Sequence, residues 1–81
     1  MMDIKYSKRS VKTINNMDSR TKQRIKKAIE SIPSGDIKPL KGINGSYRLR
    51  VGSWRIIFSY IEKDAVLIDK IESRGGVYKG V

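Results

Sequence analysis

The chain has 81 residues, with 18 lysines and arginines against 8 acidic residues, a net charge of +10, and neither histidine nor cysteine. This length fits one small domain. Disulfides and thiolate sites are excluded, the usual acid–base group near neutral pH is missing, and no apolar run reaches the roughly 18 residues of a membrane-spanning helix. The charge favours an anionic partner such as nucleic acid over a merely soluble basic surface.

The first third of the chain predicts one strand and two helices. Residues 3–6 alternate polar and apolar side chains, as a short half-buried strand does. A helix capped by its first residue is predicted from Ser7 to about Asn16. After a turn, Asp18 or Ser19 caps a second helix from Arg20 to about Ile32, whose isoleucines recur at spacings of three and four. Both helices carry lysines and arginines on their polar sides.

The rest of the chain predicts an antiparallel meander after a loop at Pro39 to Gly45. Three strands are joined by tight turns: Ser46–Val51, Trp54–Tyr60 and Ala65–Ile71. Asp69 interrupts the last strand, which indicates an edge position or a shifted register. The element order predicts an α+β sandwich in which the helical pair packs on one face of the meander. The apolar hairpin face expected to meet the helices comprises Tyr47, Leu49, Val51, Trp54, Ile56 and Phe58.

Three arginines share the other face of the predicted hairpin. The two-residue link Gly52-Ser53 closes a tight turn and therefore places Arg50 directly opposite Arg55. Side chains alternate along a strand, so Arg48 lies on the same face. Like charges directly opposite each other destabilise a hairpin, and guanidinium groups bind phosphate oxygens through paired hydrogen bonds. Two such arginines would indicate only a solvated face, but three predict a phosphate site.

The tail adds a fourth arginine and a tyrosine, Arg74 and Tyr78. One interpretation is a disordered basic tail with an ordinary surface tyrosine. The interpretation we favour places Arg74 beside Arg55 at the end of a strand, with Tyr78 folded over a base. Stacking of a nucleobase on a tyrosine contributes about 1–3 kcal/mol.

Four segments together resemble the successive signatures of the RelE family, the toxins of type II toxin–antitoxin systems in the RelE/ParE superfamily. These segments are Pro39–Gly42, Tyr47–Gly52, Trp54–Ile57 and Ser73–Tyr78. The similarity covers nearly the whole chain, so residues 1–81 are expected to form a single RelE-like toxin domain. The resemblance also implies the compact RelE-like α+β sandwich that the order of helices and strands predicts.

The resemblance implies a ribosome-dependent endoribonuclease that cleaves mRNA in the A site, with the RNA's own 2′-hydroxyl as nucleophile. Arg48 and Arg50 match the family's paired basic residues on the second strand, one of which is assigned to activate that hydroxyl. Arg55 matches the arginine that stabilises the phosphorane-like charge. Arg74 matches the arginine assigned to the leaving 5′-oxygen, and Tyr78 the tyrosine that stacks on the substrate.

Proton abstraction is the weakest step of this implied mechanism. Arg48 and Arg50 stand where the best-known member has lysines, and a guanidinium with a pKa above about 12 is a poor general base. Glu72 is the nearest carboxylate to this face and is an alternative base, although a salt bridge to Arg55 or Arg74 is its plainer role. Rate enhancement is then expected mostly from positioning and electrostatics.

The resemblance also implies the partners. We expect a cognate acidic antitoxin that covers the arginine face, the ribosome and mRNA as targets, and an antitoxin-mediated complex with operator DNA. No cofactor or metal is implied, and a cytoplasmic, monomeric free toxin without membrane association is expected. Two alternatives stay open: a ParE-like inhibitor of DNA gyrase without nuclease activity, and an inactive RNA-binding relative retained for antitoxin-dependent DNA repression.

Overall fold

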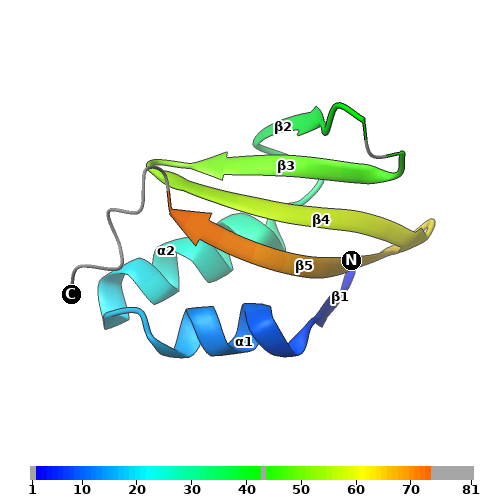
Figure 1. Cartoon of the computed structure of the whole chain (residues 1–81). Helices are drawn as coiled ribbons and strands as arrows, with labels where there is room; N and C mark the ends of the chain where they lie inside the picture. Colours follow the sequence, from blue (N-terminus) through cyan, green and yellow to red (C-terminus); the bar gives the residue numbers. More distant parts are fainter. Residues whose placement is uncertain (1, 43, 74–81) are drawn as a thin grey trace.

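Two helices cover one face of a five-stranded sheet in the computed structural model, which describes residues 2–42 and 44–73 (Figure 1). The elements in chain order are β1 (Asp3–Tyr6), α1 (Lys8–Asn15), α2 (Ser19–Glu30), β2 (Asp36–Pro39), β3 (Ser46–Val51), β4 (Trp54–Glu62) and β5 (Ala65–Ser73). The strand order is β1-β5-β4-β3-β2, and β1 pairs with β5 in parallel while the other pairs are antiparallel. The predicted α+β sandwich is confirmed.

Both helices begin at the predicted caps. The Ser7 hydroxyl accepts a hydrogen bond from the backbone N–H of Ser10 at 3.1 Å, and an Asp18 carboxylate oxygen accepts one from the N–H of Thr21 at 3.4 Å. Such bonds satisfy N–H groups that the first helical turn leaves unpaired. The second helix ends at Glu30, two residues before the predicted end. Within residues 2–42 and 44–73, neither helix has the length and apolar character needed to cross a membrane.

The core lies between the helices and the face of the hairpin that the sequence predicts to be buried. Leu49, Ile56 and Phe58 expose 2% or less of their surface, and Ile25 and Ile29 of α2 are fully buried. Tyr47, Val51 and Trp54 are half-buried and pack against this cluster at its margins. The period of two in the strands and the spacing of four in α2 therefore meet in one core, which leaves the other sheet face free for polar side chains.

β2 was not predicted, because Asp36 was assigned to the end of the second helix, Pro39 to the following loop, and the two residues between them to no element. These residues pair with β3, with Ile37 opposite Leu49 and Pro39 opposite Tyr47. A proline cannot donate to a strand ladder, and edge strands tolerate it. β2 is such an edge, and its four residues gain their strand conformation from β3 rather than from their own sequence.

Asp69 lies in a β-bulge, so of the two explanations from sequence the shifted register applies. Ile57 pairs with Lys70 and Phe58 with Ile68, which leaves Asp69 without a partner on β4. The extra residue allows Ile68 and Ile71 to point into the core although they are three positions apart.

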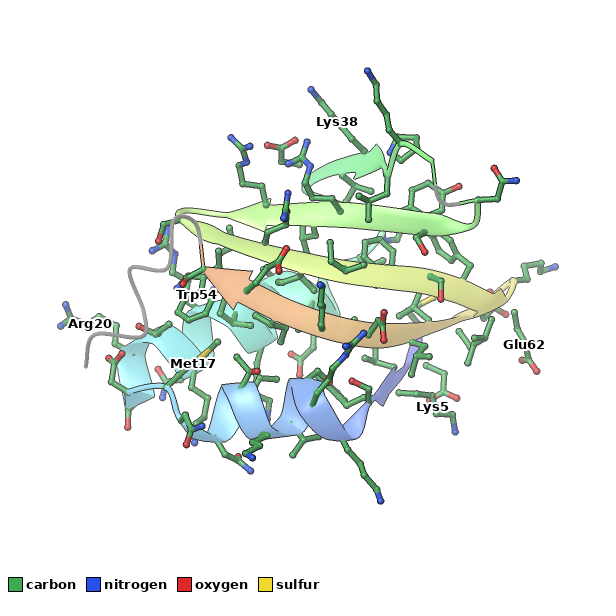
Figure 2. The ribbon with its side chains drawn as sticks, viewed as in Figure 1. Lys5, Met17, Arg20, Lys38, Trp54 and Glu62 are labelled. Carbon is green, nitrogen blue, oxygen red and sulfur yellow. The ribbon has the colours of Figure 1, made fainter. Side chains whose placement is uncertain are left out.

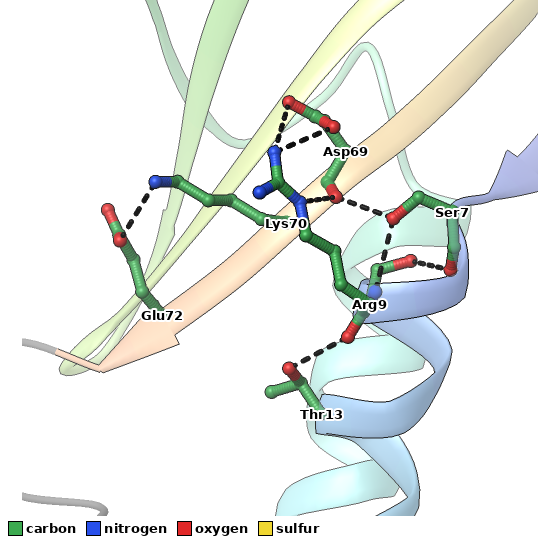
Figure 3. Close-up of polar contacts among 7 residues, drawn as sticks. Ser7, Arg9, Thr13, Asp69, Lys70 and Glu72 are labelled. Atoms are coloured by element: carbon green, nitrogen blue, oxygen red, sulfur yellow. Dashed lines mark hydrogen bonds and ion pairs between the residues drawn. The ribbon is translucent and has the colours of Figure 1, made fainter.

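The bulge also anchors α1 to the sheet (Figure 3). Nη2 of Arg9 donates to both carboxylate oxygens of Asp69, at 3.1 and 3.2 Å. Nε of Arg9 and the hydroxyl of Ser7 both donate to the backbone carbonyl of Asp69. The residue that breaks the strand pattern therefore pairs with a helix that is 60 residues away in the chain.

Replacing Gly52 with alanine is expected to lower the free energy of unfolding by about 1–2 kcal/mol. Gly52 has φ of 61°, where a Cβ clashes with its own backbone. A Cβ would also lie 2.9 Å from Nη2 of Arg24, but the end of that flexible side chain can move away. Urea denaturation measures the loss. Ser53→Ala in the same turn is the control, expected within about 0.5 kcal/mol of wild type, and equal losses in both variants would contradict the tight-turn geometry.

Candidate functional site

Two rows of mostly charged side chains cross the sheet face that points away from the helices, here called the outer face. Cross-strand pairing aligns the first row as Asp36, Arg50, Arg55 and Glu72, and the second as Lys38, Arg48, Ile57 and Lys70. Residues directly opposite each other share a face. The predicted opposition of Arg50 and Arg55 is confirmed, and a carboxylate residue flanks the arginines at each end of their row. Figure 2 shows Lys38 pointing away from the helices.

Arg55 is paired with Glu72. Nε and Nη2 of Arg55 both donate to the same carboxylate oxygen, Oε2, and the Nε bond is 2.8 Å long. The second oxygen, Oε1, lies 3.6 Å from Nζ of Lys70. The Arg55 and Glu72 side chains are 53% and 32% exposed. The salt-bridge role predicted for Glu72 is therefore confirmed for Arg55, and Glu72 offsets part of the repulsion between Arg50 and Arg55.

The same pairing makes Glu72 a weak base. The hydrogen bond from Arg55 is the main cause that lowers the pKa of the Glu72 carboxyl, and the charges of Arg55 and Lys70 lower it further. A carboxylate with a lowered pKa accepts a proton less readily. The alternative role of Glu72 as the general base is therefore disfavoured by its surroundings.

The contribution of this pair to stability is expected to disappear in acid. Folding lowers the pKa of Glu72, so the ion pair stabilises the native state at pH values above the unfolded carboxyl pKa of about 4.3. This stabilisation is lost as the pH falls through the lower pKa of the native carboxyl. Wild type should exceed Glu72→Gln by less than about 1 kcal/mol in unfolding free energy at neutral pH. Urea denaturation at neutral and strongly acidic pH measures the difference, and a difference that grows in acid would contradict this pairing.

Arg48 provides an unsatisfied donor in the second row. Its side chain is half-buried, and Nη1 is buried without a hydrogen-bond partner among the described residues. Ile57, directly opposite, is only 7% exposed although it lies on the outer face. Arg48 and Lys70 lie directly opposite Ile57 on the two neighbouring strands, and the aliphatic stems of such side chains can cover apolar surface. A buried N–H without a partner is costly, so a movement of the Arg48 side chain that brings Nη1 to a hydrogen-bond acceptor would be favourable.

A cavity of about 330 Å³ lies where the first row meets the β3–β4 turn. Its lining residues are Arg50, Gly52, Ser53, Trp54, Arg55, Glu72 and Ser73. This volume is at the lower end of the range for small-molecule sites, and two guanidinium groups form part of its wall. It can therefore accept a phosphate group together with part of a nucleotide.

The structure brings part of the predicted site together. Arg50 and Arg55 line the cavity, and Arg48 lies in the adjacent row. Arg74 and Tyr78 lie outside the described residues, so their roles stay predictions. The sequence did not lead us to expect Lys70 on this face. Lys70 comes directly after the bulged residue Asp69 and pairs with Ile57 of β4.

Two further cations were also missed. Lys38 joins the second row through the unpredicted strand β2. Arg24 of α2 reaches the β3–β4 turn, where its guanidinium packs against Gly52 of the cavity wall. Cations on a helix and on an edge strand carry no local signal for this placement, because only the tertiary fold brings them near the hairpin.

A match to a protein-family model identifies the class of protein to which the chain belongs. The family model described as the ParE toxin of the type II toxin–antitoxin system parDE matches residues 4–78. The chain therefore belongs to this toxin family, within the RelE/ParE superfamily, and the resemblance seen in the sequence is confirmed.

Individual relatives are RelE toxins. Putative toxin RelE1 of Methanocaldococcus jannaschii is 29% identical over 85 residues, which cover 95% of this chain and 94% of the relative. Toxin RelE3 of the same organism is 28% identical, with coverage of 95% and 96%. The RelB-RelE antitoxin–toxin complex from Methanococcus jannaschii has a chain that matches with a TM-score of 0.73 and 27% identity, covering 91% of this chain and 94% of that one.

The isolated E. coli RelE toxin shows that the fold persists at lower identity. It superimposes with a TM-score of 0.72 at 18% identity, covering 91% of this chain and 85% of the E. coli chain. At this identity the likeness concerns the fold alone. This chain is therefore a RelE-like toxin by family, relatives and fold.

Proposed function

We propose that this toxin is a ribosome-dependent endoribonuclease that cleaves mRNA in the ribosomal A site and so stops translation. The observation that carries the proposal is Arg50 and Arg55, directly opposite each other on the wall of an open cavity, with Arg48 in the adjacent row of the same face. A fold does not by itself imply a function. Two arginines directly opposite each other beside one cavity, however, suit a ligand with several anionic oxygens.

The proposed reaction is attack of an RNA 2′-oxygen on the adjacent phosphorus, which forms a cyclic phosphate and breaks the bond to the 5′-oxygen. Negative charge grows on the phosphoryl oxygens in the transition state, and preorganised donors stabilise it most. Arg50 and Arg55 would supply those donors. Arg48, in the adjacent row, would add positive charge beside them.

Proton transfer is assigned to no described side chain. The 2′-hydroxyl proton passes to solvent, and the leaving 5′-oxygen takes a proton from solvent, because Glu72 is held by Arg55 and a guanidinium is a poor general base. Arg74 is proposed to stabilise the leaving 5′-oxygen and Tyr78 to stack on a base. Positioning and electrostatic stabilisation would then account for most of the rate enhancement.

An acidic antitoxin is the proposed regulatory partner. The toxin's net charge of +10 and the basic rows of the outer face suit a peptide rich in carboxylates. The solved complexes of relatives are of RelB with RelE. We propose that the antitoxin neutralises this face, links the complex to operator DNA, and keeps in check a toxin that is otherwise a cytoplasmic monomer.

Inhibition of DNA gyrase is the second candidate function. The match to the family model described as the ParE toxin favours it. A gyrase inhibitor would not need an anion cavity with opposed arginines. That cavity therefore supports the nuclease over the gyrase inhibitor.

One experiment separates the two functions. The purified chain is added to a translation reaction with ribosomes and a defined mRNA, and new RNA 5′ ends are mapped. Supercoiling by gyrase is assayed in parallel with the same preparation. We expect cuts in translated mRNA only, with naked mRNA and supercoiling unaffected. Intact mRNA together with inhibited supercoiling would instead establish the gyrase inhibitor.

A further inference from the structure

In the free toxin, a phosphate-binding edge of Arg55 is already occupied. Its Nε and Nη2 both donate to Oε2 of Glu72. A guanidinium offers a phosphate the same kind of paired donors that it offers a carboxylate. A phosphate therefore cannot use this edge of Arg55 until the Glu72 carboxylate leaves it.

The strand provides a second cation that can hold the displaced carboxylate. Oε1 of Glu72 already lies 3.6 Å from Nζ of Lys70, which precedes it by two residues on the same face of β5 (Figure 3). Rotation of the Glu72 side chain toward Lys70 would break the contact with Arg55 while keeping a counter-charge. The displacement therefore leaves no carboxylate unpaired.

The two opposed arginines differ in their availability. Among the described residues the side chain of Arg50 makes no hydrogen bond or ion pair, whereas that of Arg55 is held by Glu72. Both line the same cavity. An incoming anion can thus contact Arg50 first and then compete with Glu72 for Arg55.

We propose that Glu72 is an internal counter-anion that occupies Arg55 in the free toxin and moves to Lys70 when a phosphate group binds in the cavity. The proposal concerns the regulation of the site and rests on the proposed function for its biological meaning. It makes Glu72 a positioning residue that acts through Arg55. The contact lowers affinity for small anions, and an RNA held at several points overcomes it.

Binding of inorganic phosphate tests this without any RNA cleavage. The Arg55 Nε–H signal is followed by NMR while phosphate is added at constant ionic strength to wild type and Glu72→Gln. Glu62→Gln is the matched control, because it makes the same charge change at an exposed position near the other end of β4 (Figure 2). We expect Glu72→Gln to bind phosphate about three- to fivefold more tightly than Glu62→Gln, the fold-change expected for loss of an exposed ion pair.

A double-mutant cycle tests whether Lys70 holds the displaced carboxylate of Glu72. Lys70→Met should weaken phosphate binding more in the wild-type background than in Glu72→Gln, because only wild type has a carboxylate to displace. Equal effects in both backgrounds would overturn the transfer to Lys70. Phosphate affinities of Glu72→Gln and Glu62→Gln that are equal, or an unmoved Arg55 signal, would overturn the counter-anion itself. Tighter phosphate binding by Glu72→Gln in a protein that never cuts mRNA would contradict the proposed nuclease function but support the role of Glu72 as a counter-anion.

Discussion

Replacing Arg55 with alanine is expected, on the proposed nuclease function, to lower ribosome-dependent mRNA cleavage by about 10²–10³-fold and to abolish toxicity in growing cells. Removing one preorganised donor from a site that stabilises transition-state charge has an effect of this size. Arg55→Lys should recover only part of the activity, because an ammonium keeps the charge but loses the planar pair of donors. Cleavage rates on translated mRNA and colony counts after induction measure both variants.

The free energy of unfolding of Arg55→Ala should stay close to that of wild type, although its cleavage activity falls. The substitution removes the partner of Glu72, but it also removes the repulsion between Arg50 and Arg55, and Lys70 stays close to the carboxylate. Lys63→Ala in the exposed β4–β5 turn makes the same change in net charge far from the cavity and should remain active and toxic. Full cleavage activity in Arg55→Ala would refute the assigned site, whatever the result for Lys63→Ala.

Local rules were sufficient for the hairpin that carries the arginines. A two-residue link beginning with glycine allows one register, and the alternation along both strands then assigns every side chain to a face. Gly52 has the positive φ that this turn requires, and Val51 pairs with Trp54 on either side of it. The opposition of Arg50 and Arg55 follows from these local rules alone.

The same local rules could not predict how β2 pairs with β3 or where the register between β4 and β5 shifts. β2 is stabilised as a strand by β3, and the bulge at Asp69 shifts the register of β5 by one residue. Lys38 and Lys70 reach the outer face only through these two features. The environment of Glu72 likewise depends on the β4–β5 register, so the sequence alone offered a base and a salt bridge as competing roles.

Alanine at Phe58 is expected to remove most of the fold's stability, at about 3–5 kcal/mol. Phe58 is fully buried, its ring stacks on Tyr47 at a centroid distance of 5.8 Å, and it meets Tyr60 edge-on at 5.7 Å. A domain of this length has about 4–12 kcal/mol to lose. The cavity left in the middle of β4 would weaken the strand that also holds Arg55. Urea denaturation of the purified chain measures the loss.

Phe58→Leu separates the effect of the lost volume from that of the lost ring. Leucine fills most of the space and keeps the site apolar, so the variant should lose less than about 1.5 kcal/mol and remain toxic. Phe58→Ala should lose toxicity because it unfolds, although every residue of the cavity wall is intact. If both variants were equally stable, the packing of β4 against α2 would not be the main support of the sheet. The arginine pair would then depend on the β3–β4 hairpin itself, and Gly52→Ala should reduce cleavage as well as stability.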